Sequence, residues 1–209
     1  STHPAEQIPM VIVTLTCNTS GGQPVSMQNL RDVHELSKKY DVKAFEFSQN
    51  YTAFYDKFEK INYFMEAMDD FLDADQDDRT LQHLLKTGVQ DGGQWDMFVA
   101  LVLKYGVVPM DAMEETASSS KTAFMNRLIN IKLRQYAAVV RKLAKENKKE
   151  EIVSVKKRYL DEFYTFLVTS FGKPPKTFDF EYVSNDKFEV IITEPSSYFL
   201  LTIWKNRFA

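Results

Sequence analysis

Residues 91–109, DGGQWDMFVALVLKYGVVP, decide the fold that the sequence predicts. Gly92 and Gly93 have no Cβ atom, so they permit a positive φ and the close approach of another backbone. The side chains from 95 to 103 are nearly all apolar, which is typical of a helix buried on most sides. Gly106 stands where a left-handed C-cap belongs. The glycine pair therefore indicates either a tight turn before a core helix or a place where an extended peptide docks.

Helical spacing dominates the rest of the chain. Ser48 is placed to cap a helix over about 49–72, in which apolar residues recur three and four positions apart. Asp77 or Asp78 can cap a short helix that Gly88 ends. Further helices are predicted over about 28–40, 118–147, 150–170 and the tail from 195, a strand over 8–16, and a β-hairpin from the alternating segments 178–182 and 187–192. The sequence thus predicts an α+β fold that is predominantly helical, with more than about 40% helix.

Two expectations concern burial. The helix from 95 to 105 is expected to be the most buried of all, Trp95 included. The long helix over about 118–147 is expected to begin in the serine cluster and to bury one side. The candidates for that side are Phe124, Leu128, Ile131, Val139 and Leu143.

Composition excludes several classes of protein. The chain has 209 residues, 44% of them apolar and 26% charged, and a net charge of -3, which gives no electrostatic case for nucleic acid or an anionic membrane. The basic runs at 142–149 and 156–158 are interleaved with glutamate and predict solvated helix faces. One cysteine, Cys17, excludes an internal disulfide framework. No apolar run approaches the roughly 18 residues that span a bilayer, and no signal peptide is recognisable, so we expect a cytoplasmic protein.

No metal or cofactor site is expected. Asp73, Asp75 and Asp77 have the first spacings of a calcium loop. However, Asp78 stands where that loop needs glycine, and Leu84 where it needs a bidentate glutamate. We therefore interpret the stretch as a solvated acidic loop. The histidines have no zinc-ligand spacing; they are His3, His34 and His83.

Four segments resemble one family of known proteins. They are FEFSQNYTAFYDKFEKINYFMEAMDDF (45–71), DGGQWDMFVALVLKYGVVP (91–109), YGVVPMDAMEETASSSKTAFMNRLINIKLRQYA (105–137) and, more weakly, TFDFEY (177–182). Through them the chain resembles the bleomycin hydrolase and aminopeptidase C family of papain-like cysteine peptidases. The resemblance implies the helical half of a papain-like fold, with helical insertions and a small β-hairpin. It also implies one domain over 1–209, in which 1–33 diverge, 34–182 are family-like and 183–209 are a divergent or truncated tail.

The nucleophile of that family is not found where the resemblance places it. Family members carry a segment close to T-N-Q-x-x-S-G-R-C-W-x-F-A, whose cysteine is the nucleophile and whose glutamine helps to form the oxyanion hole. The corresponding stretch, TCNTSGGQPVSMQNLRDV at 16–33, puts Gln23 or, in a second register, Gly22 in the cysteine's place, and it lacks the glutamine. Cys17 lies several residues too early, after an apolar run that predicts strand or buried coil. The family's histidine and asparagine lie beyond the part that this chain matches.

The resemblance leaves two hypotheses of function. Family members are cysteine aminopeptidases that cleave residues from peptide N-termini through an acyl-thioenzyme and assemble as hexameric rings. The first hypothesis is such an enzyme, as a partial or altered chain that is inactive alone. The second is a non-catalytic peptide-binding or structural relative, a pseudoenzyme that keeps Gly92 and Gly93 as peptide-contacting residues. Under both, peptides and further copies of the chain are the expected partners, and an apolar face is expected around 15–33 and near Trp95.

Overall fold

The chain forms two compact units, of which the second holds most of the described structure. The computed structural model describes residues 16–17, 23–24, 28–29, 31–32, 35, 46–184 and 187–193. The first unit comprises Ser1–Glu46 with Leu200–Ala209, and the second Phe47–Phe199. The single domain that we predicted over 1–209 stays a prediction, because most of the first unit lies outside the described residues.

In the first unit, two short strands pair with each other. Strand β1 (Thr16–Cys17) runs antiparallel to β2 (Gln23–Pro24), and Cys17 lies opposite Gln23. The described residues between 28 and 35 are helical, in agreement with the helix expected there. The remainder of the predicted strand at 8–16, of the helix at 28–40 and the whole predicted helical tail fall outside the described residues.

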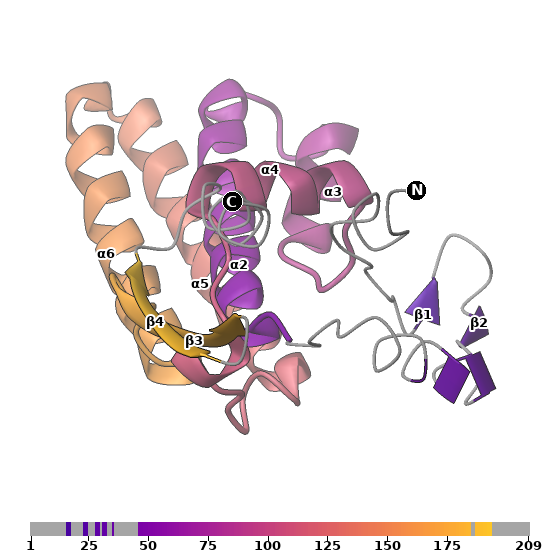
Figure 1. Cartoon of the computed structure of the whole chain (residues 1–209). Helices are drawn as coiled ribbons and strands as arrows, with labels where there is room; N and C mark the ends of the chain where they lie inside the picture. The colour runs from indigo at the N-terminus through magenta and orange to yellow at the C-terminus, as the bar shows by residue number, and fades with distance from the viewer. Residues whose placement is uncertain are drawn as a thin grey trace. The chain divides into compact units, whose positions relative to one another are not determined.

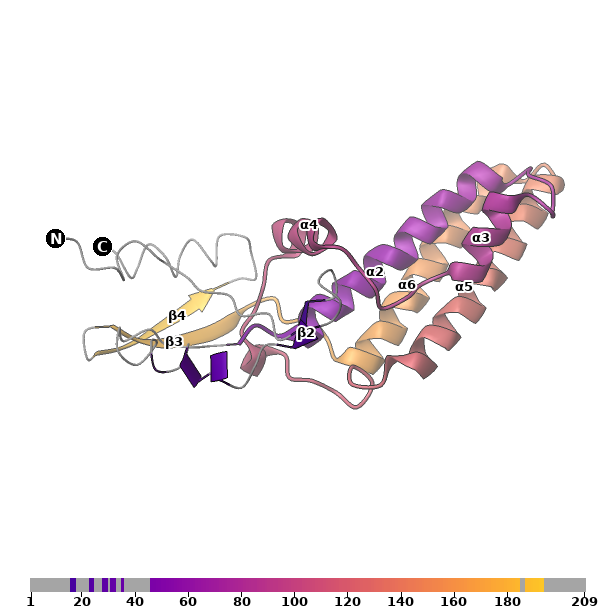
Figure 2. The same ribbon diagram turned by 90° about the vertical axis from the view of Figure 1, so that its right-hand side faces the viewer.

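Three long helices form the core of the second unit. They are α2 (Gln49–Ala67), α5 (Thr122–Lys145) and α6 (Ile152–Phe171), and they run side by side, as Figure 1 and Figure 2 show. Each of the three contacts the other two. Their facing sides supply the largest fully buried side chains, among them Phe54, Ile61, Leu133, Tyr136, Phe163 and Phe171. The hydrophobic effect on these aromatic and aliphatic side chains therefore holds the bundle together.

Shorter elements complete this unit. They are η3 (Met68–Phe71), α3 (Arg79–Thr87), α4 (Trp95–Tyr105), η4 (Met110–Ala112), η5 (Lys149–Glu151), β3 (Phe178–Ser184) and β4 (Lys187–Thr193). The two strands form an antiparallel hairpin, in register from Phe178 opposite Thr193 to Ser184 opposite Lys187. The predicted hairpin and the predominantly helical α+β class are both confirmed.

Local capping signals fix several helix ends where the sequence predicted them. The Ser48 hydroxyl accepts from the Tyr51 N–H at 3.0 Å and donates to the Met113 carbonyl at 2.5 Å, so it caps α2 and ties it to a distant loop. The Asp78 carboxylate caps α3 by accepting two backbone N–H groups. The helices α3, α4 and α6 end at Gly88, Gly106 and Gly172, whose φ angles of +55°, +75° and +88° are readily adopted by glycine.

The expected burial of α4 is wrong. No residue of α4 is buried, and Trp95 is 66% exposed. The helix packs against α2, while its remaining sides carry exposed Met97, Val99 and Leu103. Apolar residues all round a helix show that it can be buried, but only the surrounding elements decide whether it is. The exposed apolar face expected near Trp95 is present, and its predicted counterpart at 15–33 lies largely outside the described residues.

The buried side predicted for α5 is also wrong, by about one residue of rotation. The side chains that face the core are Met125, Ile129, Leu133, Tyr136, Ala137, Val140 and Ala144. Of the predicted set, Phe124, Leu128 and Ile131 are exposed, and Val139 and Leu143 are half-buried. Two adjacent stripes of this helix are apolar at helical spacing, so the pattern could not choose between them.

The serine cluster does not start α5. The helix begins at Thr122, because the hydroxyls before it are engaged in a turn. The Thr116 N–H donates to Ser119 Oγ at 2.9 Å, and the Ser119 N–H donates to Thr116 Oγ1 at 3.2 Å. Side chains of this kind compete with helix formation by satisfying nearby backbone groups.

Candidate functional site

Gly92 and Gly93 lie on an exposed, non-helical strip between Val89 and α4. Neither has a positive φ, and a Cβ atom built on either would meet nothing within 4 Å. The positive φ that we considered for them is therefore wrong, and no tight turn requires glycine here. What the glycines provide is an open surface over the backbone.

Two lysines of α2 donate hydrogen bonds to backbone carbonyls of this strip. The Lys60 ammonium donates to the Gly92 carbonyl at 2.7 Å and to the Gln90 carbonyl at 3.1 Å. It is paired in turn with Asp56 at 2.6 Å. The Lys57 ammonium, whose side chain is 3% exposed, donates to the Gln90 carbonyl at 3.0 Å. Both carbonyls therefore point toward α2.

Asp91 links the strip to α2 and α5 together. Its carboxylate accepts from Lys57 Nζ at 2.5 Å, from Thr122 Oγ1 at 2.9 Å and from Asn126 Nδ2 at 3.0 Å. Burial by itself raises the pKa of Asp91, but the hydrogen bonds from Asn126, Lys57 and Thr122 outweigh it and lower the pKa to about 2. The carboxylate is therefore ionised at neutral pH and keeps the buried ammonium paired.

The N–H group of Gly93 faces away from these anchors. The peptide bond between Gly92 and Gly93 is trans, so its N–H points opposite to its C=O. Because the Gly92 carbonyl accepts from Lys60, the Gly93 N–H points away from that lysine. Within the described part of the chain, neither this N–H nor the Gly93 carbonyl makes a hydrogen bond. One exposed donor and one exposed acceptor on one residue are what a strand-like partner needs to pair.

The C-terminal end of α4 is fastened to α2 by aromatic and ionic contacts. The rings of Tyr55 and Tyr105 stack with centroids 3.8 Å apart. The Tyr105 hydroxyl donates to the Glu59 carboxylate, which also accepts from Lys104 Nζ at 2.6 Å. Burial, and then the Glu59 carboxylate, raise the pKa of Tyr105 to about 12. The strip is thus anchored at its start by lysines, and α4, which follows it, is anchored at its far end by tyrosines.

Of the two residues expected at the nucleophile position, Gln23 does not lie at a helix start. Cys17 lies in β1 and Gln23 in β2 of the first unit. Gly22 falls outside the described residues. His83 is exposed on α3, while His3 and His34 are not described. Among the residues that the structure describes, no cluster of three potential metal ligands occurs. None of the described helices is both long and apolar enough to traverse a lipid bilayer.

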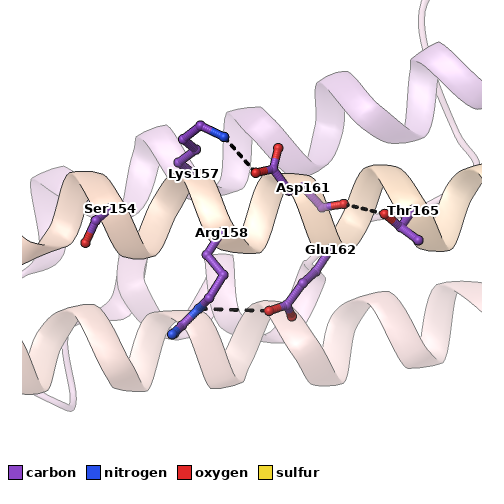
Figure 3. Close-up of a pocket in the computed structure, with 6 residues that line it drawn as sticks. All are labelled: Ser154, Lys157, Arg158, Asp161, Glu162 and Thr165. Atoms are coloured by element: carbon purple, nitrogen blue, oxygen red, sulfur yellow. Dashed lines mark hydrogen bonds and ion pairs between the residues drawn. The ribbon is translucent and has the colours of Figure 1, made fainter.

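An open depression on the outer side of α6 offers no converging groups. Figure 3 shows that the residues that line it, Ser154 excepted, pair with one another along the helix. Lys157 pairs with Asp161 at 2.8 Å, and the Thr165 hydroxyl donates to the Asp161 carbonyl at 2.9 Å. Arg158 lies 3.9 Å from Glu162. These are exposed pairs four residues apart, which contribute little and mark a solvated helix face.

The chain that carries this strip, which is bound by side chains of α2 and α5, matches a known protein family. A family model described as the Peptidase C1-like family matches residues 25–200. The chain belongs to the Peptidase C1-like family. A model described as beta-eliminating lyase matches residues 2–45, which overlap the start of the first match.

Curated relatives of this Peptidase C1-like chain are aminopeptidases. Aminopeptidase C of Listeria innocua serovar 6a is 48% identical over 153 residues, which are 73% of this chain and 34% of the relative. Aminopeptidase C of Lactobacillus delbrueckii subsp. lactis is 42% identical over 154 residues, again 73% of this chain and 34% of the relative. The chain thus spans about a third of the length of these relatives.

A solved structure supports the same assignment. The crystal structure of PepW from Lactobacillus rhamnosis HN001 matches with a TM-score of 0.72 and 44% sequence identity, over 80% of this chain and 38% of that one. The family resemblance that we drew from the sequence is therefore confirmed.

The sequence singled out Gly92 and Gly93, whose role stays a prediction, but it did not identify the side chains that bind this strip. One signal was present. Lys57 stands between Phe54 and Ile61 at helical spacing, which places a lysine on the buried side of α2. A lysine there needs a partner, because a buried unpaired ammonium is costly. That the partners are Asp91 and the Gln90 carbonyl could be learned only from the folded chain.

Proposed function

We propose that this chain is a peptide-docking part of a cysteine aminopeptidase-type protein, and that alone it does not hydrolyse peptides. The observation that carries the proposal is the exposed, unpaired backbone of Gly93. Its N–H and C=O are unused within the described part of the chain, and no side chain or neighbouring atom covers the position. An extended peptide can pair with it through two main-chain hydrogen bonds.

The absence of catalysis follows from what acyl transfer requires. A nucleophilic thiol needs a lowered pKa, a neighbouring base and a donor set for the oxyanion. Cys17 lies in a short strand rather than at a helix start. Residues 2–45, where the resemblance would place the nucleophile, match a model for beta-eliminating lyases. We take this second match as support for a first unit that does not supply a peptidase nucleophile.

The family resemblance also implies more specific functions, and these are part of the same proposal. In a full-length relative, the strip would hold a peptide whose N-terminal residue is removed by an acyl-thioenzyme. Assembly into hexameric rings, peptides as partners and a cytoplasmic location are carried over as proposals only. A purely structural role is the alternative, in which Gly92 and Gly93 contact no peptide.

Peptide titration decides between docking and a structural role. Tetra-alanine with free ends, added to 15N-labelled protein, should shift the amide signals of Gly92 and Gly93 first, with a Kd on the order of millimolar. Gly93→Val should abolish these shifts and keep the helical circular dichroism, because the added side chain meets nothing in the free protein. Shifts centred elsewhere, or none at tens of millimolar peptide, would refute docking.

A second measurement addresses activity. Purified protein should not release a chromogenic amine from aminoacyl substrates. Thiol-dependent release that disappears in Cys17→Ala would show that the nucleophile is present after all.

A further inference from the structure

We infer that Lys57, Lys60 and Asp91 are positioning residues of the docking strip: they fix the carbonyls of Gln90 and Gly92 and thereby direct the N–H of Gly93 away from α2. The inference rests on the proposed peptide docking at Gly93. None of the three side chains needs to touch the peptide, so they would act through the backbone they hold.

The lysines act on alternate carbonyls. Lys57 and Lys60 are three residues apart on α2, so their side chains emerge from the same face of the helix. Between them they donate to the carbonyls of Gln90 and Gly92. Holding the Gly92 carbonyl fixes the plane of the peptide bond between Gly92 and Gly93, and so fixes the direction of the Gly93 N–H. The orientation of this group is thus set by side chains of α2 that need not touch the peptide.

Asp91 fixes the strip along its length. Its carboxylate is shared by Lys57 of α2 and by Thr122 and Asn126 of α5. Thr122 and Asn126 are four residues apart, so they too come from one helix face. A slip of the strip by one residue would put Gln90 or Gly92 in the place of Asp91 and leave the Lys57 ammonium without its anion.

Stability alone is a poor explanation for this arrangement. The attraction within a buried ion pair offsets only part of the free energy that desolvating the charges costs. An apolar residue at position 57 could fill the space without that cost. Lys57 is 2% exposed among aromatic neighbours of α2, yet its ammonium points at the strip rather than at solvent. Holding a short exposed segment in its bound conformation removes part of the entropy cost of docking, which is a gain for binding rather than for folding.

Lys60 offers a sharper test than Lys57, because its side chain is 15% exposed. A methionine can replace it and keep an aliphatic side chain of similar length without the ammonium. In Lys60→Met, the Gly92 carbonyl loses its donor while the bundle keeps its packing. We expect tetra-alanine binding to weaken about tenfold, and Lys60→Arg to restore it. Lys157→Met is the matched control, because Lys157 pairs with Asp161 on the outer side of α6. Equal binding by Lys60→Met and the unchanged chain would overturn the inference.

A measurement on the protein without peptide tests the positioning role separately from peptide docking. Amide 15N relaxation and hydrogen exchange of Gly92 and Gly93 should show greater mobility in Lys60→Met than in Lys60→Arg or Lys157→Met. If the unchanged chain binds no peptide, docking is refuted, and the mobility data still decide whether Lys60 orders the strip. If mobility is unchanged in Lys60→Met, the positioning role fails even where peptide binds.

Discussion

The Nζ atom of Lys57 on α2 lies 2.5 Å from Oδ1 of Asp91, on the strip that leads into α4. The lysine side chain is 3% exposed and the aspartate side chain 56% exposed, so the pair joins a buried cation to an anion at the surface. The bundle therefore depends on the strip to neutralise a charge in its interior, and the strip depends on the bundle for its conformation.

The first prediction concerns acid stability. The pKa of Asp91 is about 2 in the folded chain against an ordinary value of 3.8. A lowered pKa means that the ionised carboxylate stabilises the fold fully above about pH 4, and that this contribution is lost as the pH falls toward 2. Urea unfolding between pH 7 and 2 should therefore show a steeper loss for the unchanged chain than for Asp91→Asn. Parallel pH profiles for the two proteins would contradict the shift.

A second prediction concerns the turn between α3 and the strip. The Asn130 side chain of α5 accepts the Val89 N–H at 2.7 Å and donates to the Val89 carbonyl at 3.1 Å. Val89 is buried, so Asn130→Ala leaves two backbone groups unpaired and should cost about 1–3 kcal/mol in urea unfolding.

The neighbouring glycine offers a matched pair of variants for the same region. Gly88 has a φ of +55°, and a Cβ atom there would collide with Asn130 Oδ1. Gly88→Ala should therefore destabilise the chain by about 1–3 kcal/mol. Gly93→Ala, at an open position without a positive φ, should stay within about 0.5 kcal/mol of the unchanged chain. Equal effects of the two substitutions would contradict this account of the turn.

The third prediction tests which side of α5 is buried. Leu133 is 0% exposed, so Leu133→Ala should lower the free energy of unfolding by about 2–5 kcal/mol. Ile131→Ala serves as the control, because Ile131 is 41% exposed and its truncation should cost less than about 1 kcal/mol. Similar costs at both positions would mean that the helix is rotated toward the predicted stripe.

The fourth prediction concerns the two units. Because the helical core is formed within Phe47–Phe199, a chain of those residues should fold cooperatively without residues 1–46 and 200–209. Its circular dichroism should remain helical, and its Tm should lie within a few degrees of that of the whole chain. Loss of cooperative unfolding would show that the first unit is part of the core.

Local signals explain what the sequence could predict. The helix ends follow from Ser48, Asp78, Gly88, Gly106 and Gly172, each of which acts on backbone groups within its own turn. The family motif likewise marked Gly92 and Gly93 without any knowledge of the fold. The family match covers them because they stand in one contiguous motif, so their recognition needs only adjacent residues.

Relations between helices explain what the sequence could not predict. Helix α5 has two adjacent apolar stripes. One contains Phe124, Leu128 and Ile131, and the other contains Met125, Ile129 and Leu133. The second stripe is buried only because α2 and α6 pack against it. The exposure of α4 has the same cause. Asp91 meets Lys57 and Asn126 from 34 and 35 residues away, so no spacing rule within one element could connect them.

The last prediction concerns self-association through α4. Trp95 and Leu103 are 66% and 68% exposed on a helix whose other side packs against α2. Exposed apolar side chains gathered on one helix favour contact with a second apolar surface. We expect dimers or larger species at micromolar concentration in sedimentation, and a shift to monomer in Leu103→Glu. Val153→Glu is the control, because Val153 is 76% exposed on α6 rather than on α4, and the substitution adds the same charge. A monomer at all concentrations, or equal dissociation by both substitutions, would show that the α4 face does not hold copies of the chain together.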